Sequence, residues 1–162
     1  QAITIGTVNA DFNAPATVCQ GVGVPFVNTS QPNPASAVWD FGDGTTSTSL
    51  NPVKAYASAG NYFVKLVSNF GACKDSVTKP IVVLPKPVAA FTGLNTSACQ
   101  PPLTTTFNSS VPGAVAYKWF FGDGDSADIA NPSHTYTGTG SFDVTLVVTN
   151  AAGCTDTLRQ PG

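Results

Sequence analysis

One segment occurs twice in this chain, and the repeat limits the possible folds more than any other feature. The stretch WDFGDGTTSTSLNP at residues 39–52 returns as WFFGDGDSADIANP at residues 119–132. A shift of 80 positions aligns the two stretches and also aligns Tyr56 with Tyr136; further along, the shift becomes 81. Self-similarity at a fixed period indicates copies of one structural unit. The 162 residues therefore predict two tandem domains of the same fold.

Both copies show the alternation of a half-buried β-strand. Tyr62, Val64 and Leu66 take every second position, and the second copy repeats this pattern at the matching place. Alternation with a period of two is typical of strands with one buried face. Thr, Ser, Asn, Gly and Pro are abundant and all nine acidic residues are Asp, which favours strands and turns over helices. We predict an all-β chain in which each copy forms a β-sandwich of about seven short strands.

The same rule predicts the aromatic core of each copy. Trp39 and Phe41 lie two residues apart and share one face of their strand, as do Trp119 and Phe121. We expect all four side chains in the cores.

The acidic glycine segments raise the choice between a ligand site and a turn. Asp43-Gly44 and Asp123-Gly124 each follow an alternating strand, and Asp-Gly is a strong turn signal because Gly adopts positive φ readily. A phosphate-binding loop would need a longer glycine run with Lys and a following helix. We therefore predict structural turns.

These motifs together resemble a known family. WDFGDG, then NPxxxY, then GxYxVxL, once per roughly 80 residues, is similar to the PKD (polycystic kidney disease) domain, and the likeness covers nearly the whole chain. The second copy departs from it with Phe120 in place of Asp40. The resemblance implies an immunoglobulin-like β-sandwich that serves as an extracellular interaction or spacer module and has no catalytic residues of its own.

Prolines and the repeat phase suggest the domain boundaries. Pro85 and Pro87 stiffen a short join, so we predict a linker at 85–87 between domains at 9–84 and 88–162. Gly162 aligns with Ile81, so the second domain lacks the apolar end of its last strand.

Residues 1–8 resemble the tail of a preceding repeat, as in a window taken from a longer array. Ile3 and Ile5 alternate as Ile81 and Val83 do, which makes them candidate contact residues. We hypothesise that this segment completes the open edge of the second domain of another copy. The alternative is a leader that pairs with its own first domain or hangs free.

The four cysteines indicate an oxidising environment, because their spacing lacks the close pairs of zinc sites. Three pairings are possible, but one pair falls in each copy, with spacings of 54 and 55 residues. This symmetry favours two disulfides, Cys19–Cys73 and Cys99–Cys154.

Candidate ligand sites are few. Asp123, Asp125 and Asp128 have the alternating oxygen spacing that a calcium loop uses, but the first copy lacks this set; we expect no cofactor, with calcium as the alternative. Phe120 lies on the strand face opposite Trp119, where an exposed aromatic could contact a sugar or a neighbouring domain. His134 is the only histidine and has no partnered nucleophile in the sequence, so we predict no enzyme.

The net charge and the hydropathy of the chain limit the classes of partner that it could bind. The net charge of −2 with seven scattered Lys and Arg offers no basic patch for nucleic acid, and no apolar run is long enough for membrane insertion. We predict a secreted or cell-surface structural or adhesive repeat of a stalk or filament, whose partners are copies of itself, adjacent repeats, or extracellular polysaccharide or protein. The alternative is a carbohydrate- or protein-binding accessory module of a secreted hydrolase.

Overall fold

The computed structural model describes residues 7–94 and 96–162 and divides into two compact units, Gln1–Pro85 and Lys86–Gly162. Sixteen strands make up the regular structure of the described residues, which include no helix. Accordingly, the described part of the chain holds no helix of a length and apolarity that would cross a lipid bilayer. The fold confirms the prediction of an all-β chain of two tandem immunoglobulin-like β-sandwiches.

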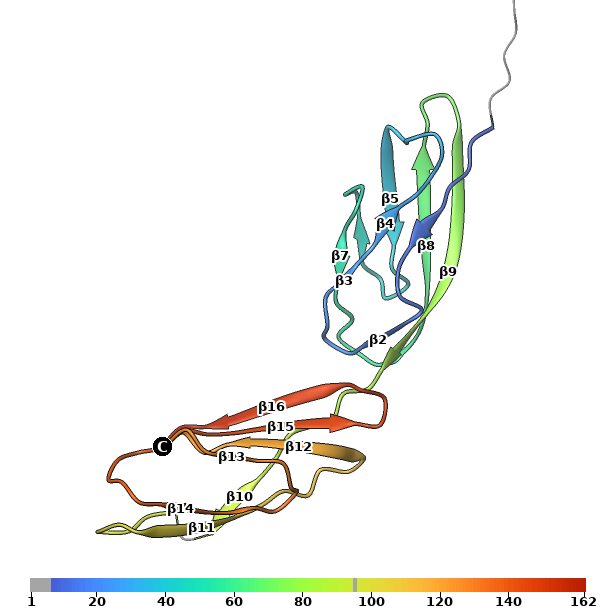
Figure 1. Cartoon of the computed structure of the whole chain (residues 1–162). Coiled ribbons are helices and arrows are strands. Elements are labelled where there is room, and N and C mark those ends of the chain that lie inside the picture. Colours follow the sequence, from blue (N-terminus) through green and yellow to red (C-terminus); the bar gives the residue numbers. More distant parts are fainter. Residues whose placement is uncertain (1–6, 95) are drawn as a thin grey trace, which may run out of the picture. The chain divides into compact units, whose positions relative to one another are not determined.

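The first unit has one long sheet and a second layer of short strand pairs (Figure 1). The long sheet has the order β2 (Thr17–Cys19), β9 (Lys74–Leu84), β8 (Gly60–Asn69), β5 (Ser36–Asp40) and β6 (Thr46–Ser47). The other layer contains the pairs β1 (Phe12–Asn13) with β4 (Val27–Asn28) and β3 (Val24–Pro25) with β7 (Val53–Lys54). All pairs are antiparallel except that of β2 with the end of β9, which is parallel.

The second unit repeats this plan with fewer pairings. Its larger sheet has the order β13 (Ser126–Ala127), β12 (Ala114–Phe120), β15 (Val144–Asn150) and β16 (Thr155–Gln160). The facing sheet has the order β10 (Thr92–Leu94), β11 (Leu103–Asn108) and β14 (Ser133–Tyr136).

A tryptophan at the centre of each unit organises its core. Trp39 and Trp119 are fully buried, and the indole Nε1–H of each donates to a backbone carbonyl at 2.9 Å, that of Ser49 and Ile129 respectively. Phe41 and Phe121 are also buried. These side chains meet the core because alternate residues of a strand face the same side.

In each unit, a buried tyrosine forms a hydrogen bond to the backbone directly after the tryptophan-bearing strand. The hydroxyl of Tyr56 donates to the carbonyl of Phe41 at 3.2 Å, and Tyr136 donates to Phe121 at 3.0 Å. Burial, with the nearby charge of Asp43 or Asp123, raises the pKa of both tyrosines to about 12. Both hydroxyls therefore keep their proton at neutral pH and remain donors.

The predicted disulfides Cys19–Cys73 and Cys99–Cys154 are wrong. Cys73 and Cys99 are exposed free thiols, whereas Cys19 and Cys154 are disulfide-bonded. Cys19 pairs with Leu84 at one end of β9, while Cys73 precedes the other end at Lys74. A strand of eleven residues spans about 35 Å, far beyond the roughly 7 Å that a disulfide tolerates between Cα atoms.

The second unit gives the same physical reason. Cys154 directly precedes β16, whereas Cys99 lines a groove together with Gln160, where β16 ends. Cys99 is a free thiol and so is not bonded to Cys154. Equal spacing in the sequence reflects the repeat and not proximity.

Candidate functional site

The two glycine segments form tight turns at the ends of β5 and β12. Asp43 Oδ1 accepts the backbone N–H of Thr45 at 3.1 Å, and Asp123 Oδ1 accepts that of Asp125 at 3.2 Å. Gly44 and Gly124 have φ of 84° and 106°, a region that favours glycine. Each carboxylate therefore stabilises the turn in which it lies.

A basic residue from the other layer of the sandwich contacts each turn, Lys54 from β7 and His134 from β14. Lys54 Nζ lies 2.6 Å from Asp43 Oδ2, and His134 Nε2 lies 2.7 Å from Asp123 Oδ2. The ring of His134 also stacks on that of Phe121, with centroids 4.2 Å apart and planes 2° from parallel. The histidine thus does in the second unit what the lysine does in the first. The contact of His134 with Asp123 was not predicted. The alignment of Lys54 with His134 and of Asp43 with Asp123 could have indicated it.

Asp123, Asp125 and His134 bring potential ligand atoms within 4.8 Å of one another. Asp128, the third residue of the predicted calcium spacing, lies outside this cluster and pairs with Lys118 at 2.8 Å. Because Lys54 occupies the matching place in the first unit, we interpret the cluster as a side-chain contact between His134 and Asp123 that stabilises the turn.

These aspartates predict a loss of stability in acid. Burial alone would raise the pKa of Asp43 and Asp123, but hydrogen bonds from Lys54 and Thr45, and from His134 and Asp125, hold both pKa values below the ordinary range. The folded state then binds fewer protons than the unfolded state, so the stabilisation is present above the unfolded pKa and is lost as pH falls through the folded pKa. We expect melting temperatures followed by circular dichroism to decrease steeply below about pH 4.

A matched variant makes this expectation specific. Asp123→Asn removes the charge that His134 contacts, so it should lower the melting temperature at neutral pH. It should also make the melting temperature of the second unit less dependent on pH in acid. A melting temperature unchanged by acid in the parent chain would contradict the assignment.

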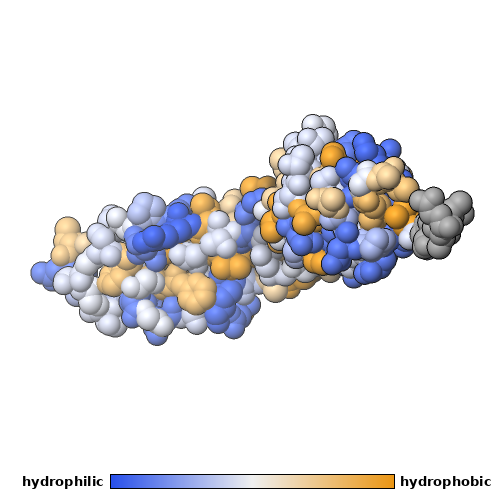
Figure 2. Space-filling view, turned by 90° about the horizontal axis from the view of Figure 1, so that it is seen from above, coloured by the Kyte–Doolittle hydropathy of each residue, from blue (hydrophilic) through white to orange (hydrophobic). Residues whose placement is uncertain are grey.

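Phe120 is 46% exposed on β12, as the alternation predicts. Lys118 Nζ lies 5.9 Å from the centre of its ring. In the first unit Asp40 takes this position and its Oδ1 accepts the N–H of Gly42 at 2.9 Å. Elsewhere, apolar surface lies in small groups between hydrophilic residues on the face shown in Figure 2.

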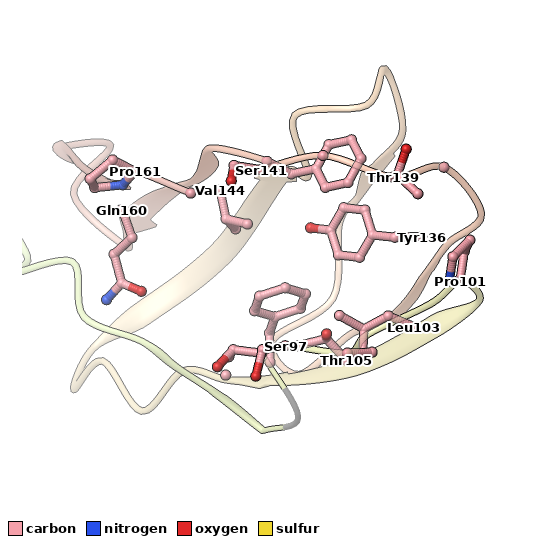
Figure 3. A pocket seen from close by; sticks show the side chains of 18 of the residues that line it. Ser97, Pro101, Leu103, Thr105, Tyr136, Thr139, Ser141, Val144, Gln160 and Pro161 are labelled. Atoms are coloured by element: carbon pink, nitrogen blue, oxygen red, sulfur yellow. The ribbon is translucent and has the colours of Figure 1, made fainter.

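A groove of about 630 Å³ opens into the second unit (Figure 3). Leu103 and Thr105 of β11 and Tyr136 of the adjacent strand β14 form one side, and Val144 of β15 belongs to the other sheet. The groove also reaches the loop at 138–142 and the segment Gln160–Gly162.

The first unit shows what occupies this place when a strand is present. There β9 continues to Leu84, and Ile81 and Val83, each 2% exposed, belong to the core. They pair with Tyr62 and Gly60 of β8. In the second unit the register of β15 with β16 ends at Val144 with Gln160, and Gly162 lies beside the backbone of Phe142.

Three strand segments of the first unit thus have no counterpart in the described second unit. They are β2, the end of β9, and the first four residues of β8, whose equivalents at 140–143 are outside any strand. These segments pair with one another in the first unit. The described second unit therefore has fewer strand pairings than the first unit beside the groove.

The predicted contact residues Ile3 and Ile5 lie outside the described residues. Of the 1–8 segment the structure describes Thr7 and Val8, neither of them in a strand. The next residue, Asn9, forms a bridge with Gln31 in the first unit.

Comparison with protein families gives a match over both units. The family model described as the PKD domain matches residues 7–83 and 84–161. The chain is 38% identical over 86 residues to a microbial collagenase of Vibrio alginolyticus, which covers 50% of the chain and 11% of that protein. It is 42% identical over 55 residues to the pre-pro-metalloprotease PrtV of Vibrio cholerae, covering 34% and 6% respectively. The matches thus span a small part of these relatives.

Solved structures with a similar sequence include two single domains. The PKD1 domain of Vibrio anguillarum Epp is 30% identical and covers 48% of this chain and 90% of its own, with a TM-score of 0.41. The PKD1 domain of Vibrio cholerae PrtV is 34% identical and covers 48% and 94%, with a TM-score of 0.39.

Proposed function

The chain belongs to the PKD domain family, and from this membership we propose that it is a non-catalytic structural module of an extracellular stalk or filament. The observation that carries the proposal is the tandem arrangement of two compact units of the same family, each with a fully buried tryptophan in its core. Two units joined through Pro85 and Pro87 would then repeat along the filament.

The relatives and the disulfide-bonded cysteines support an extracellular setting. The matched segments belong to collagenases and a pre-pro-metalloprotease, and collagen is found outside cells. Disulfide-bonded Cys19 and Cys154 suit an oxidising compartment.

The assembly that we propose is head to tail, with the 1–8 segment of one copy joined to the second unit of the next. A contact of this heterologous kind does not close on itself and so generates open filaments. Electron microscopy of the full chain, combined with size-exclusion light scattering, should show filaments with an axial repeat of two domains. A stable monomer at all concentrations would refute this function.

A second candidate is an accessory module that binds polysaccharide or protein beside a secreted hydrolase. The exposed rings of Phe120 and Phe63, 46% and 67% accessible, favour it, because aromatic rings stack on sugars. In that case the monomer should bind an insoluble polysaccharide in pull-down assays and lose that binding in Phe120→Ala.

A further inference from the structure

We propose that Cys99 of one copy and Cys73 of a second copy form an intermolecular disulfide, which joins the second unit of one copy to the first unit of the next. This inference rests on the proposed function and names a covalent joint for it. Both residues are exposed free thiols. The partner is therefore another PKD unit that carries a thiol at the complementary position.

The internal repeat supplies the evidence, because each free cysteine has a bonded counterpart. Cys99 aligns with Cys19 after a shift of 80 residues, and Cys73 aligns with Cys154 after a shift of 81. Cys19 and Cys154 are disulfide-bonded. Both cysteine positions of the PKD unit thus take part in a disulfide in this chain. The two free thiols are one of each kind, Cys99 at the early position and Cys73 at the late position.

The turn that carries Cys73 matches the turn of its bonded counterpart. Cys73 directly precedes β9 in the turn after β8, and Cys154 directly precedes β16 in the turn after β15. In each turn an asparagine Oδ1 accepts the backbone N–H two residues later, at 3.0 Å for Asn69 and at 3.1 Å for Asn150. The same type of turn therefore holds a cysteine in both units, but Cys73 is exposed whereas Cys154 is buried.

The two cysteine positions of the first unit lie at opposite ends of that unit. Cys19 pairs with Leu84, the last residue of β9, whereas Cys73 directly precedes the first residue of that strand. Figure 1 shows the turn between β8 and β9 at the end of the first unit opposite to β2. A thiol at each end of a unit favours bonds from one unit to another. A bond of Cys99 to Cys73 joins unlike surfaces, the heterologous arrangement from which filaments are built.

The bond forms by thiol–disulfide exchange, with a small-molecule disulfide such as oxidised glutathione as the oxidant. The thiolate of Cys99 attacks one sulfur of the oxidant, which releases one glutathione thiolate and leaves a mixed disulfide on Cys99. The thiolate of Cys73 of the second copy then attacks the sulfur of Cys99 and releases the second glutathione thiolate. Two protein thiols are thus oxidised and the oxidant is reduced to two thiols. The two protons pass through solvent from the cysteines to the released glutathione.

Two variants with one free thiol each test the pairing. Cys73→Ser keeps only the free thiol of Cys99, and Cys99→Ser keeps only that of Cys73. Equimolar full-length chains, one of them labelled with a heavy nitrogen isotope, are mixed in a glutathione redox buffer, and intact mass spectrometry distinguishes the three possible dimers. We expect the mixed dimer to exceed either homodimer severalfold. Peptide mapping checks that Cys19 and Cys154 stay bonded.

Three results would overturn the proposal. The first is a set of dimers in the proportions of random pairing, because it would mean that the exposed thiols react without recognition between units. The second is a mixture that forms no dimer. The third is a bond between Cys73 and Cys99 of the same copy, which would appear as an oxidised monomer of the parent chain.

A second experiment separates this joint from the filament itself. In the oxidised parent chain we expect a ladder of oligomers on a non-reducing gel, which collapses with reductant and is absent from the double variant Cys73→Ser, Cys99→Ser. If the double variant forms the same filaments as the parent chain in electron micrographs and the mixture gives random dimers, the disulfide joint is wrong while the proposed function stands. If the mixed dimer is selective but the oxidised parent chain forms no filament with an axial repeat of two domains, the joint stands and the proposed function is wrong.

Discussion

Replacement of Gly42 by alanine should destabilise the first unit by about 3 kcal/mol or more. Gly42 has a φ of +76°, where a Cβ alone costs about 1–2 kcal/mol. The added Cβ would also lie 2.8 Å from the carbonyl oxygen and 3.1 Å from the nitrogen of Phe63. These are backbone atoms within β8, a central strand of the sheet, so they cannot move without disturbing its pairing with β9 and β5. Urea denaturation followed by tryptophan fluorescence gives the free energy of unfolding.

Gly44 supplies the matched control two residues away. Its φ is +84°, but an added Cβ would meet nothing within 4 Å. Gly44→Ala should therefore cost only the backbone term, about 1–2 kcal/mol. The second unit repeats the comparison, because the Cβ of an alanine at Gly122 would lie 2.6 Å from the carbonyl oxygen of Asp143, while Gly124 is open. Equal losses at the two glycines of a pair would show that the close approach to the strand is unimportant.

The turns and the buried strand faces could be predicted from the sequence, but the contact of Gly42 with a distant strand could not. Asp-Gly after an alternating strand predicts a turn from local chemistry alone, and the alternation of Trp39 with Phe41 predicts the buried face. Both depend on residues close in sequence. That Gly42 touches Phe63 depends on which strands are neighbours, and no local pattern contains that information.

The cysteines show the same limit more sharply. Their spacing reflects the repeat, but it does not indicate where β9 and β16 begin and end in the fold. Cys73 and Cys19 lie at opposite ends of the long strand β9, so the disulfide predicted from the symmetry of the repeat cannot form. The contact of His134 with Asp123 could have been predicted, because Lys54 aligns with His134 and Asp43 aligns with Asp123.

The shorter strand pairing of the described second unit predicts that the two units differ in their free energy of unfolding. Each of Ile81 and Val83 contributes about 1.5–3 kcal/mol by burial, and the second unit holds Gly162 where Ile81 lies. It also lacks a counterpart of the parallel pairing of β2 with β9 among its described residues. Part of that burial is already present in a compact unfolded chain, which lowers the estimate. We expect the second unit to be less stable than the first by about 3 kcal/mol.

One tryptophan per unit allows each transition to be followed separately. In Trp119→Phe the remaining Trp39 reports on an unsubstituted first unit, and in Trp39→Phe the remaining Trp119 reports on an unsubstituted second unit. The urea midpoint observed through Trp119 should lie below that observed through Trp39. Coincident midpoints would contradict this prediction, because they would mean that the second core compensates for its fewer strand pairings by its own packing.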